Sequence, residues 1–223
     1  GLVLPYQCIE KMNISDSTRW RLAQTLSKHS ISTVCGQSLE MTLLPNRDFS
    51  LESYTNAALG KTGAFFGLPM EGIAYLAKLN EEDRQELTTL FTRIGLLFQM
   101  QDDILDCFGN KGRKRGADIC EGKISTLVVH HLQLHPQELP LFVQILENNN
   151  ETPQGTIDHC IELFAKEGAL DLALETIRTL EQQLCSADIL LRYPHIQKLV
   201  QGLIDTIMYP IQHLFLRSLE MTQ

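Results

Sequence analysis

Apolar residues recur along this chain at the three- and four-residue intervals of an α-helix. The segment from Asn80 to about Gly109 is the clearest case, because eight apolar side chains form one stripe along it: Leu87, Leu90, Phe91, Ile94, Leu97, Phe98, Ile104 and Leu105. Asn80 is a favoured N-cap residue, and the acids Glu81, Glu82 and Asp83 suit the positive end of a helix dipole. The pattern therefore predicts one long helix with a buried stripe.

Helical spacing also occurs on both sides of this segment. Proline and glycine punctuate it, and we end one helix at Leu68 because Pro69 follows. We expect helices over 1–12, 15–44, 50–68, 69–79, 80–109, 126–132, 141–147, 156–167, 170–184 and 196–207, with Ser15, Ser50 and Thr156 as caps. No stretch shows convincing period-two alternation, so the expected fold is all-α.

Length and composition indicate an ordinary globular protein. The chain of 223 residues suits one domain over 1–223, and its apolar fraction of 43% and charged fraction of 21% are typical. A net charge of −8 argues against a nucleic-acid surface. No apolar run reaches the ~18 residues of a membrane span, so we expect no transmembrane segment.

The thiols and imidazoles form no recognisable metal pattern in the sequence. Six cysteines are scattered without a C-x-x-C pair, which favours reduced thiols in a cytoplasmic protein. The seven histidines, including His130, His131 and His135, have no partner spacing that suggests zinc.

Polar residues gather on the helical face opposite the apolar stripe. At ~100° per residue, Gln99, Asp102, Asp103 and Asp106 fall on one side, with Gly95 one turn earlier. Neighbouring carboxylates repel one another, and aspartate is a poor helix former. A solvated acidic face is one interpretation. The sharper one is a Mg²⁺–diphosphate site, because Mg²⁺ commonly binds one or two carboxylates together with substrate phosphates.

Basic residues follow directly after these carboxylates. The loop 109–118 carries Lys111, Arg113, Lys114 and Arg115 between glycines, and Lys123 comes shortly after it. In an acidic chain, this cluster is suited to an anion held at the same place, although a solvated basic loop is the alternative.

Small residues and a lysine mark a second region upstream. Gly60, Gly63 and Gly67 form a seam on one helix side that allows close helix packing. Lys61-Thr62 lies beside this seam, while Gln37 and Glu40 share a face of the preceding helix. The alternatives are a surface lysine for Lys61 and a satisfied or solvated pair for Gln37 and Glu40.

Together these elements resemble the trans-isoprenyl diphosphate synthases, which include the farnesyl and geranylgeranyl diphosphate synthases. The resemblance rests on the following motifs in this order: Gly36-Gln37-x-x-Glu40, Lys61-Thr62, Phe98-Gln99-x-x-Asp102-Asp103-x-x-Asp106, Gly112-Arg113-x-x-Gly116-x-Asp118 and Lys123. It implies roughly antiparallel helices around a central cavity, in a homodimer. It also implies Mg²⁺-dependent condensation of isopentenyl diphosphate with an allylic diphosphate.

The resemblance also implies roles for individual residues. Asp102, Asp103 and Asp106 would hold the metal. Gln37, Lys61, Lys123 and Arg113 or Lys114 would bind substrate, and Lys61, Thr62 and Gln99 would line the reacting centre.

The chain departs from the family pattern at its start. The family's other aspartate-rich motif, with an adjacent arginine pair, would fall before or near Gly1, and the sequence contains neither there. We therefore expect a chain that lacks its N-terminal third and is inactive alone. The alternatives are a non-catalytic partner subunit of a synthase and a class I terpene cyclase; the Lys61-Thr62 pair argues against the cyclase.

Overall fold

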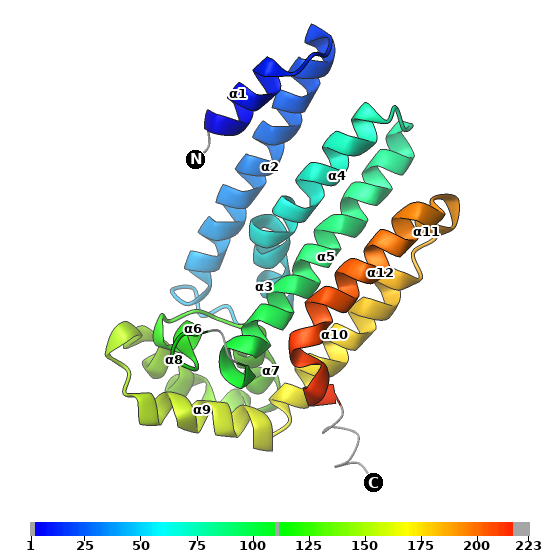
Figure 1. Cartoon of the computed structure of the whole chain (residues 1–223). Helices are drawn as coiled ribbons and strands as arrows, with labels where there is room; N and C mark the ends of the chain where they lie inside the picture. The colour runs from blue at the N-terminus through cyan, green and yellow to red at the C-terminus, as the bar shows by residue number, and fades with distance from the viewer. Residues whose placement is uncertain (1–2, 110–111, 216–223) are drawn as a thin grey trace.

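The computed structural model describes residues 3–109 and 112–215, and this part is helical throughout (Figure 1). The α-helices are α1 (Val3–Lys11), α2 (Asp16–Leu43), α3 (Leu51–Ala58), α4 (Ala64–Leu76), α5 (Glu81–Phe108), α6 (Ala117–Cys120), α7 (Thr126–Leu134), α8 (Leu139–Glu147), α9 (Gln154–Lys166), α10 (Ala169–Cys185), α11 (Ile189–Arg192) and α12 (Pro194–Met208). No strand occurs among the described residues, so the predicted all-α fold is confirmed.

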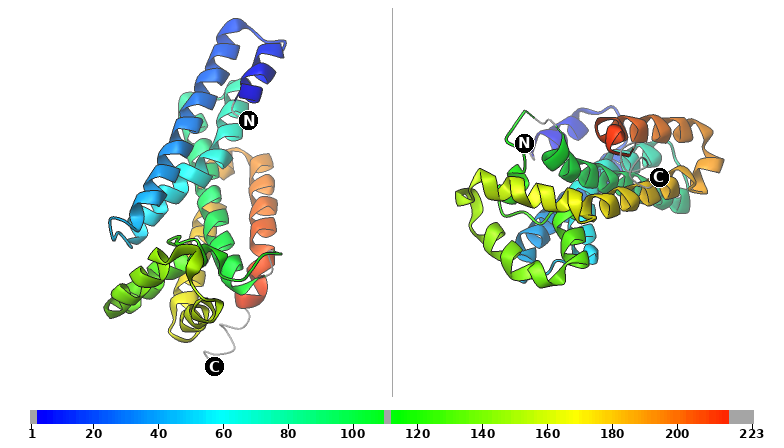
Figure 2. Two further views of the ribbon diagram at one scale, coloured as in Figure 1. Left: turned by 90° about the vertical axis from the view of Figure 1, so that its left-hand side faces the viewer. Right: turned by 90° about the horizontal axis from the view of Figure 1, so that it is seen from below.

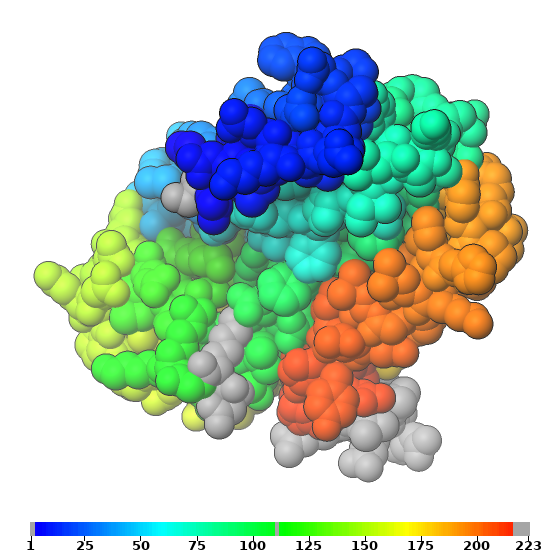
Figure 3. Space-filling view, turned by 45° about the horizontal axis from the view of Figure 1, so that its top comes forward, coloured from blue at the N-terminus to red at the C-terminus, as the bar shows by residue number. Residues whose placement is uncertain are grey.

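Helix α5 is the element against which the other long helices pack. It contacts α4 on one side and α10 and α12 on another, while α7 packs near its C-terminal end. Figures 1 and 2 show α2, α4, α5, α10 and α12 running roughly alongside one another, with α9 crossing them at one end of the bundle. The space-filling view in Figure 3 shows cyan and green surface of the middle of the chain between the blue N-terminal helices and the orange-red α12 on one face.

The predicted stripe on α5 is buried at six of its eight positions, while Leu105 is half-buried and Phe98 is exposed. Leu87, Ile94 and Ile104 are fully buried, and Asn80 caps the helix by accepting a hydrogen bond from the Asp83 N–H at 2.8 Å. Phe98 was expected in the core but is 38% exposed. Its ring instead lies 5.6 Å from that of Phe66 on α4, so this edge of the stripe forms a surface contact.

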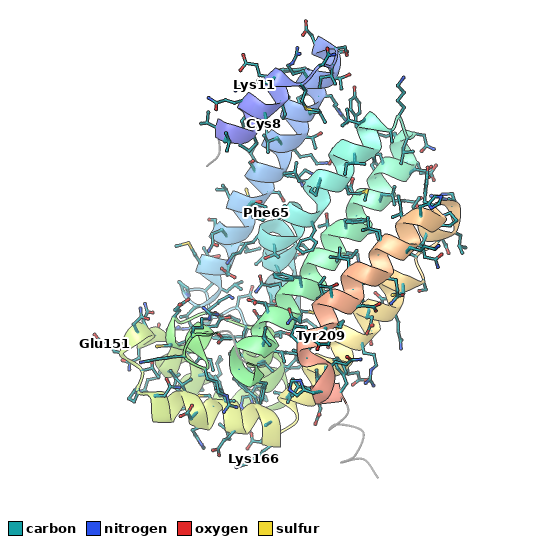
Figure 4. All side chains as sticks on the ribbon, in the orientation of Figure 1. Cys8, Lys11, Phe65, Glu151, Lys166 and Tyr209 are labelled. Carbon is teal, nitrogen blue, oxygen red and sulfur yellow. The ribbon has the colours of Figure 1, made fainter. Side chains whose placement is uncertain are left out.

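The helix predicted to end at Leu68 continues to Leu76. Pro69 lies inside α4, which follows α3 through one π-helical turn over Leu59–Gly63. A proline frees the carbonyl of the residue four positions earlier. That residue is Phe65, labelled in Figure 4 and 63% exposed, so this turn of the helix lies at the surface of the chain.

A second boundary was also misplaced. Thr156 was expected to cap α9, yet the helix begins at Gln154 with Pro153 as the preceding extended residue. Proline is preorganised for the entry to a helix, which moves the start earlier than a threonine cap would.

Glycines allow the helices to touch backbone to backbone. A Cβ at Gly36 would lie 2.2 Å from the Lys61 backbone N, and one at Gly95 would lie 2.6 Å from Gly63 Cα. The predicted seam of Gly60, Gly63 and Gly67 faces these contacts. It brings the Lys61-Thr62 segment against both α2 and α5.

We expect Gly36→Ala to lower the free energy of unfolding by about 3 kcal/mol, the upper end of overpacking costs, because the obstructing atoms are backbone. Gly202→Ala is the control, since a Cβ there meets nothing within 4 Å in α12. That variant should gain up to ~1 kcal/mol of helix propensity. Urea unfolding of both variants measures the difference, and equal stabilities would contradict the close-contact explanation.

A buried carboxylate joins α2 to α4. Glu71 Oε2 lies 2.8 Å from His29 Nε2 and 2.8 Å from Lys28 Nζ, and its side chain is 8% exposed. The hydrogen bond from His29, followed by the contributions of Lys28, lowers the pKa of Glu71 to about 2 despite burial.

This pKa shift predicts a loss of stability in acid. Because the folded pKa is below the ordinary value of 4.5, the contribution is complete above pH 4.5 and disappears as the pH falls through about 2. It amounts to about 3 kcal/mol at most. Glu71→Gln should therefore be less stable than wild type at pH 6. The difference in the free energy of unfolding between the two, measured by urea unfolding, should be smaller at pH 3. A gap independent of pH would refute the assignment.

Candidate functional site

Most of the predicted site residues border one cavity of about 720 Å³. Its walls come from α2, the π-helical turn, α5 and the segment that follows the basic loop. The predicted residues that line it are Gln37, Lys61, Gln99, Asp102, Arg113 and Lys123. Elements far apart in sequence thus contribute carboxylates and cations to one space.

Asp103 lies behind the cavity wall and is fully buried. Its carboxylate accepts hydrogen bonds of 2.8 Å from the Tyr54 hydroxyl, the Gln99 amide and the Thr126 backbone N–H. Burial raises the pKa of Asp103, and the nearby Lys123 ammonium opposes that rise. Asp103 therefore ties α5 to α3 and to the start of α7.

Asp106 fixes the course of the segment after the basic loop. Its Oδ2 accepts the Asp118 backbone N–H at 3.0 Å, and its Oδ1 lies 2.8 Å from the Arg113 guanidinium. Arg113 also reaches Asp118 Oδ1 at 3.0 Å. Although burial lowers the pKa of Arg113, Asp106 and Asp118 together raise it. The arginine is thus bound to carboxylates at the cavity edge.

Lys123 approaches the same carboxylates from the other side. Its Nζ lies 3.0 Å from Asp118 Oδ2 and 3.6 Å from Asp103 Oδ1, with the lysine side chain 19% exposed. Burial opposes its charge, but Asp103 and Asp118 raise the pKa of Lys123 well above its usual range. The lysine is therefore a permanent cation at this wall.

The opposite wall carries a second polar group. Lys61 Nζ lies 2.6 Å from Glu40 Oε2, and Gln37 donates to the same oxygen at 3.1 Å. The Thr62 hydroxyl donates to Gln99 Oε1 at 2.7 Å. Because Gln99 also donates to Asp103, a chain of hydrogen bonds runs from Thr62 through Gln99 to the buried carboxylate.

The rest of the predicted basic cluster lies apart from the cavity. Lys114 is exposed on the loop and is not among the lining residues. Arg115 donates to the Cys107 carbonyl, and its guanidinium lies 5.7 Å from the centre of the Phe108 ring. Lys111 lies outside the described residues. Among the described basic residues of the loop, Arg113 borders the cavity.

The carboxylates offer hard oxygen ligands of the kind that Mg²⁺ prefers. One carboxylate oxygen from each of Asp102, Asp103 and Asp118 lies within 4.8 Å of the others. The donor set fits a divalent cation of this class, with Asp102 bordering the cavity. Sequence reasoning did not single out Asp118 as a ligand. Its place in the Gly116-x-Asp118 motif, directly after the basic loop, was the available signal.

A family profile and individual relatives point to the same protein family. The profile of the family described as Polyprenyl synthetase matches residues 2–164. The chain is 36% identical over 129 residues to the "Short chain isoprenyl diphosphate synthase" of Methanocaldococcus jannaschii, covering 56% of this chain and 39% of the relative. It is 32% identical over 137 residues to the "Farnesyl pyrophosphate synthase" of Gallus gallus, covering 57% and 36%. The chain thus spans well under half the length of these two relatives.

Solved structures share the fold. A crystal structure of a geranylgeranyl pyrophosphate synthase superposes with a TM-score of 0.80 at 21% identity, covering 92% of this chain and 65% of that one. The geranylgeranyl pyrophosphate synthase from Bacteroides thetaiotaomicron gives 0.74 at 25% identity, covering 83% and 62%. The all-α isoprenoid synthase fold expected from the sequence is therefore confirmed. Because the family profile matches most of the length of this chain, the chain belongs to the polyprenyl synthetase family.

Proposed function

We propose that this protein is a prenyltransferase that condenses isopentenyl diphosphate with an allylic diphosphate, giving geranyl-, farnesyl- or geranylgeranyl-type products. One observation carries the proposal. This chain, which belongs to the polyprenyl synthetase family, has a cavity lined by the carboxylate Asp102 and by the cations Lys61, Arg113 and Lys123. Metal-bridged diphosphates need both kinds of group within reach of one another.

The cationic side chains would bind the diphosphate and stabilise its negative charge as it departs. When the allylic C–O bond breaks, negative charge develops on the departing diphosphate oxygens. Lys61, Lys123 and Arg113, with Lys114 from the loop, would stabilise that charge as it forms, and Gln37 would add a polar contact. Electrostatic groups held in place beforehand contribute most, and the ion pairs of Lys61 and Lys123 hold these two cations in place.

Thr62 and Gln99 would sit beside the reacting carbon. Their hydrogen bond at 2.7 Å fixes the Gln99 amide, whose NH₂ group is already directed to Asp103. The amide oxygen would then face the reacting centre as a fixed dipole. Such a dipole favours the developing positive charge on the allylic fragment without offering a nucleophile.

We assign the metal to Mg²⁺, held by Asp102, Asp103 and Asp106 as the motif implies. Asp118, which forms a cluster with Asp102 and Asp103, is a further candidate ligand. When bound, it would supply electrostatic stabilisation of the diphosphate oxygens. Because the chain's carboxylates alone leave an octahedral shell incomplete, we expect tight binding only together with a diphosphate.

The test separates binding from turnover. Calorimetry on the 223-residue chain with a bisphosphonate should show binding that requires Mg²⁺ and disappears in EDTA. Turnover is measured on the longest natural form that contains the chain, with labelled isopentenyl diphosphate and each allylic diphosphate in turn. Bisphosphonate binding that is equal in EDTA and Mg²⁺, or the absence of any chain-elongated product, would reject the proposal.

We further propose a cytoplasmic homodimer with one domain over 1–223. Six free cysteines suit a reducing compartment. Large apolar side chains are exposed on α2, among them Trp20 at 67%, Val34 at 64% and Met41 at 69%, which suits a partner surface. No described helix has the length and apolar character to cross a membrane. Light scattering after size exclusion should give twice the chain mass, and a monomer at all concentrations would contradict the homodimer.

A further inference from the structure

Three metal-ligating side chains meet at the end of the bundle where α9 crosses. His131 lies in the last turn of α7, His135 caps that helix, and Glu167 follows the last residue of α9. Lys166, labelled in Figure 4, marks this corner. One ligand atom from each of the three lies within 4.8 Å of the others. The spacing of His131 and His135 places both on one helix face, but Glu167 is distant in sequence and could not be paired with them beforehand.

Two polar atoms in this cluster lack hydrogen-bond partners within the part of the chain that the structure describes. These are His131 Nδ1, on a fully buried side chain, and Glu167 Oε2, a buried atom of a half-exposed residue. Buried polar atoms are nearly always satisfied, so each exception calls for a bridging water or ion. Both exceptions belong to the same cluster of ligands.

The surroundings of His131 are those of a metal-binding imidazole. Its Nε2 lies 2.8 Å from Glu138 Oε2, a contact that fixes the ring and directs Nδ1 to the other side. The Phe142 and Phe164 rings pack at centroid distances of 4.7 and 5.5 Å. Metal-bound histidines commonly engage a carboxylate through the second ring nitrogen, which orients the ring and raises its basicity.

The distance between the other two ligands also suits a shared ion. His135 Nε2 lies 3.6 Å from Glu167 Oε2, beyond hydrogen-bond range, and 3.2 Å from the Glu167 carbonyl oxygen. Two ligands of one tetrahedral zinc ion, each about 2.0–2.1 Å from the metal, lie about 3.3 Å apart. A small rotation of the His135 ring would exchange the carbonyl contact for a bond to the ion.

We propose that His131, His135 and Glu167 form a zinc site that is separate from the carboxylate cavity. Glu138 orients His131, and a solvent molecule completes the tetrahedron. Two imidazoles and one carboxylate suit Zn²⁺, whereas Mg²⁺ prefers oxygen ligands alone. His135 and Glu167 are 28% and 34% exposed, which gives the ion a path from solvent. The site would fasten the end of α7 to the junction of α9 and α10.

The test is calorimetry of the full chain with ZnCl₂, under reducing conditions and in an Asp102→Asn background that disables the other cluster. We expect one Zn²⁺ per chain at this site and a rise in melting temperature, because the ion binds only the folded state. Excess Mg²⁺ should not compete. Co²⁺ in place of Zn²⁺ should give the visible absorption of a tetrahedral site.

Variants decide which residues are responsible. His135→Asn and Glu167→Gln, both at half-exposed positions, should abolish the site while the chain still folds. Glu138→Gln should weaken binding about 10- to 100-fold through the orientation of His131. His159→Asn, an exposed histidine on α9, is the control and should bind like its parent. Undiminished Zn²⁺ binding in Glu167→Gln, or no binding in the parent, would overturn the proposal, and a bridging water would then explain the two unpartnered atoms.

Discussion

In the longest natural form that contains the chain, Asp102→Asn should lower kcat/KM for the proposed prenyl transfer by about two to three orders of magnitude. The free energy of unfolding should change less than in Asp103→Asn. Asp102 borders the cavity, whereas Asp103 and Asp106 are buried behind it. The substitution keeps the side-chain shape but removes a charge from the candidate metal ligand. The loss should appear as weaker Mg²⁺-dependent bisphosphonate binding and as a lower kcat.

The matched control is Asp205→Asn, which removes the same charge from an exposed position on α12. It should leave binding and turnover unchanged. Asp103→Asn provides the contrast, because that carboxylate accepts three hydrogen bonds in the interior. It should lower stability as well as activity. Normal turnover in Asp102→Asn would show that the cavity carboxylate has no part in the reaction.

The sequence predicted the helices well where side-chain periodicity and capping act locally. Asn80, Ser15 and Ser50 each cap the helix expected of them, and the α5 stripe is buried apart from Phe98 and the half-buried Leu105. The error at Pro69 arose because a proline inside a helix can kink it without ending it. Whether Phe65 faces water depends on tertiary packing, which helical spacing does not reveal.

The sequence predicted which aspartates belong to the candidate site, but not which of them are buried and which border the cavity. Asp102, Asp103 and Asp106 look alike in the motif, yet one borders a cavity and two are buried. Asp103 is held by Tyr54 and Thr126, and Asp106 accepts the Asp118 backbone N–H, so the partners of both come from other helices. The cluster of His131, His135 and Glu167 was missed for the same reason, because α9 brings in its third member.

Lys123→Met should lower the free energy of unfolding by about 3–5 kcal/mol, the usual cost of removing one partner from a buried ion pair. The Asp103 and Asp118 side chains are 0% and 5% exposed, so the variant leaves two nearly buried carboxylates without this ammonium. Methionine retains the volume of the lysine stem, which confines the change to charge. Lys166→Met is the control: its pair with Glu162 has side-chain exposures of 72% and 62%, and such pairs contribute only about 0.3–0.5 kcal/mol.

The pH dependence of this loss identifies its cause. Without Lys123, burial should raise the pKa of Asp103 further above its ordinary value of 3.8, since the lysine is the influence that opposes burial most. A folded state with a raised carboxyl pKa binds protons more readily than the unfolded chain does, so acid favours it. The difference in the free energy of unfolding between wild type and Lys123→Met should therefore be largest at pH 7 and become smaller as Asp103 is protonated. Urea unfolding at pH 7 and pH 4 measures it, and Lys123→Arg, which keeps the charge, should restore part of the stability. A gap of equal size at both pH values would mean that packing, not the unbalanced Asp103 charge, makes Lys123 necessary.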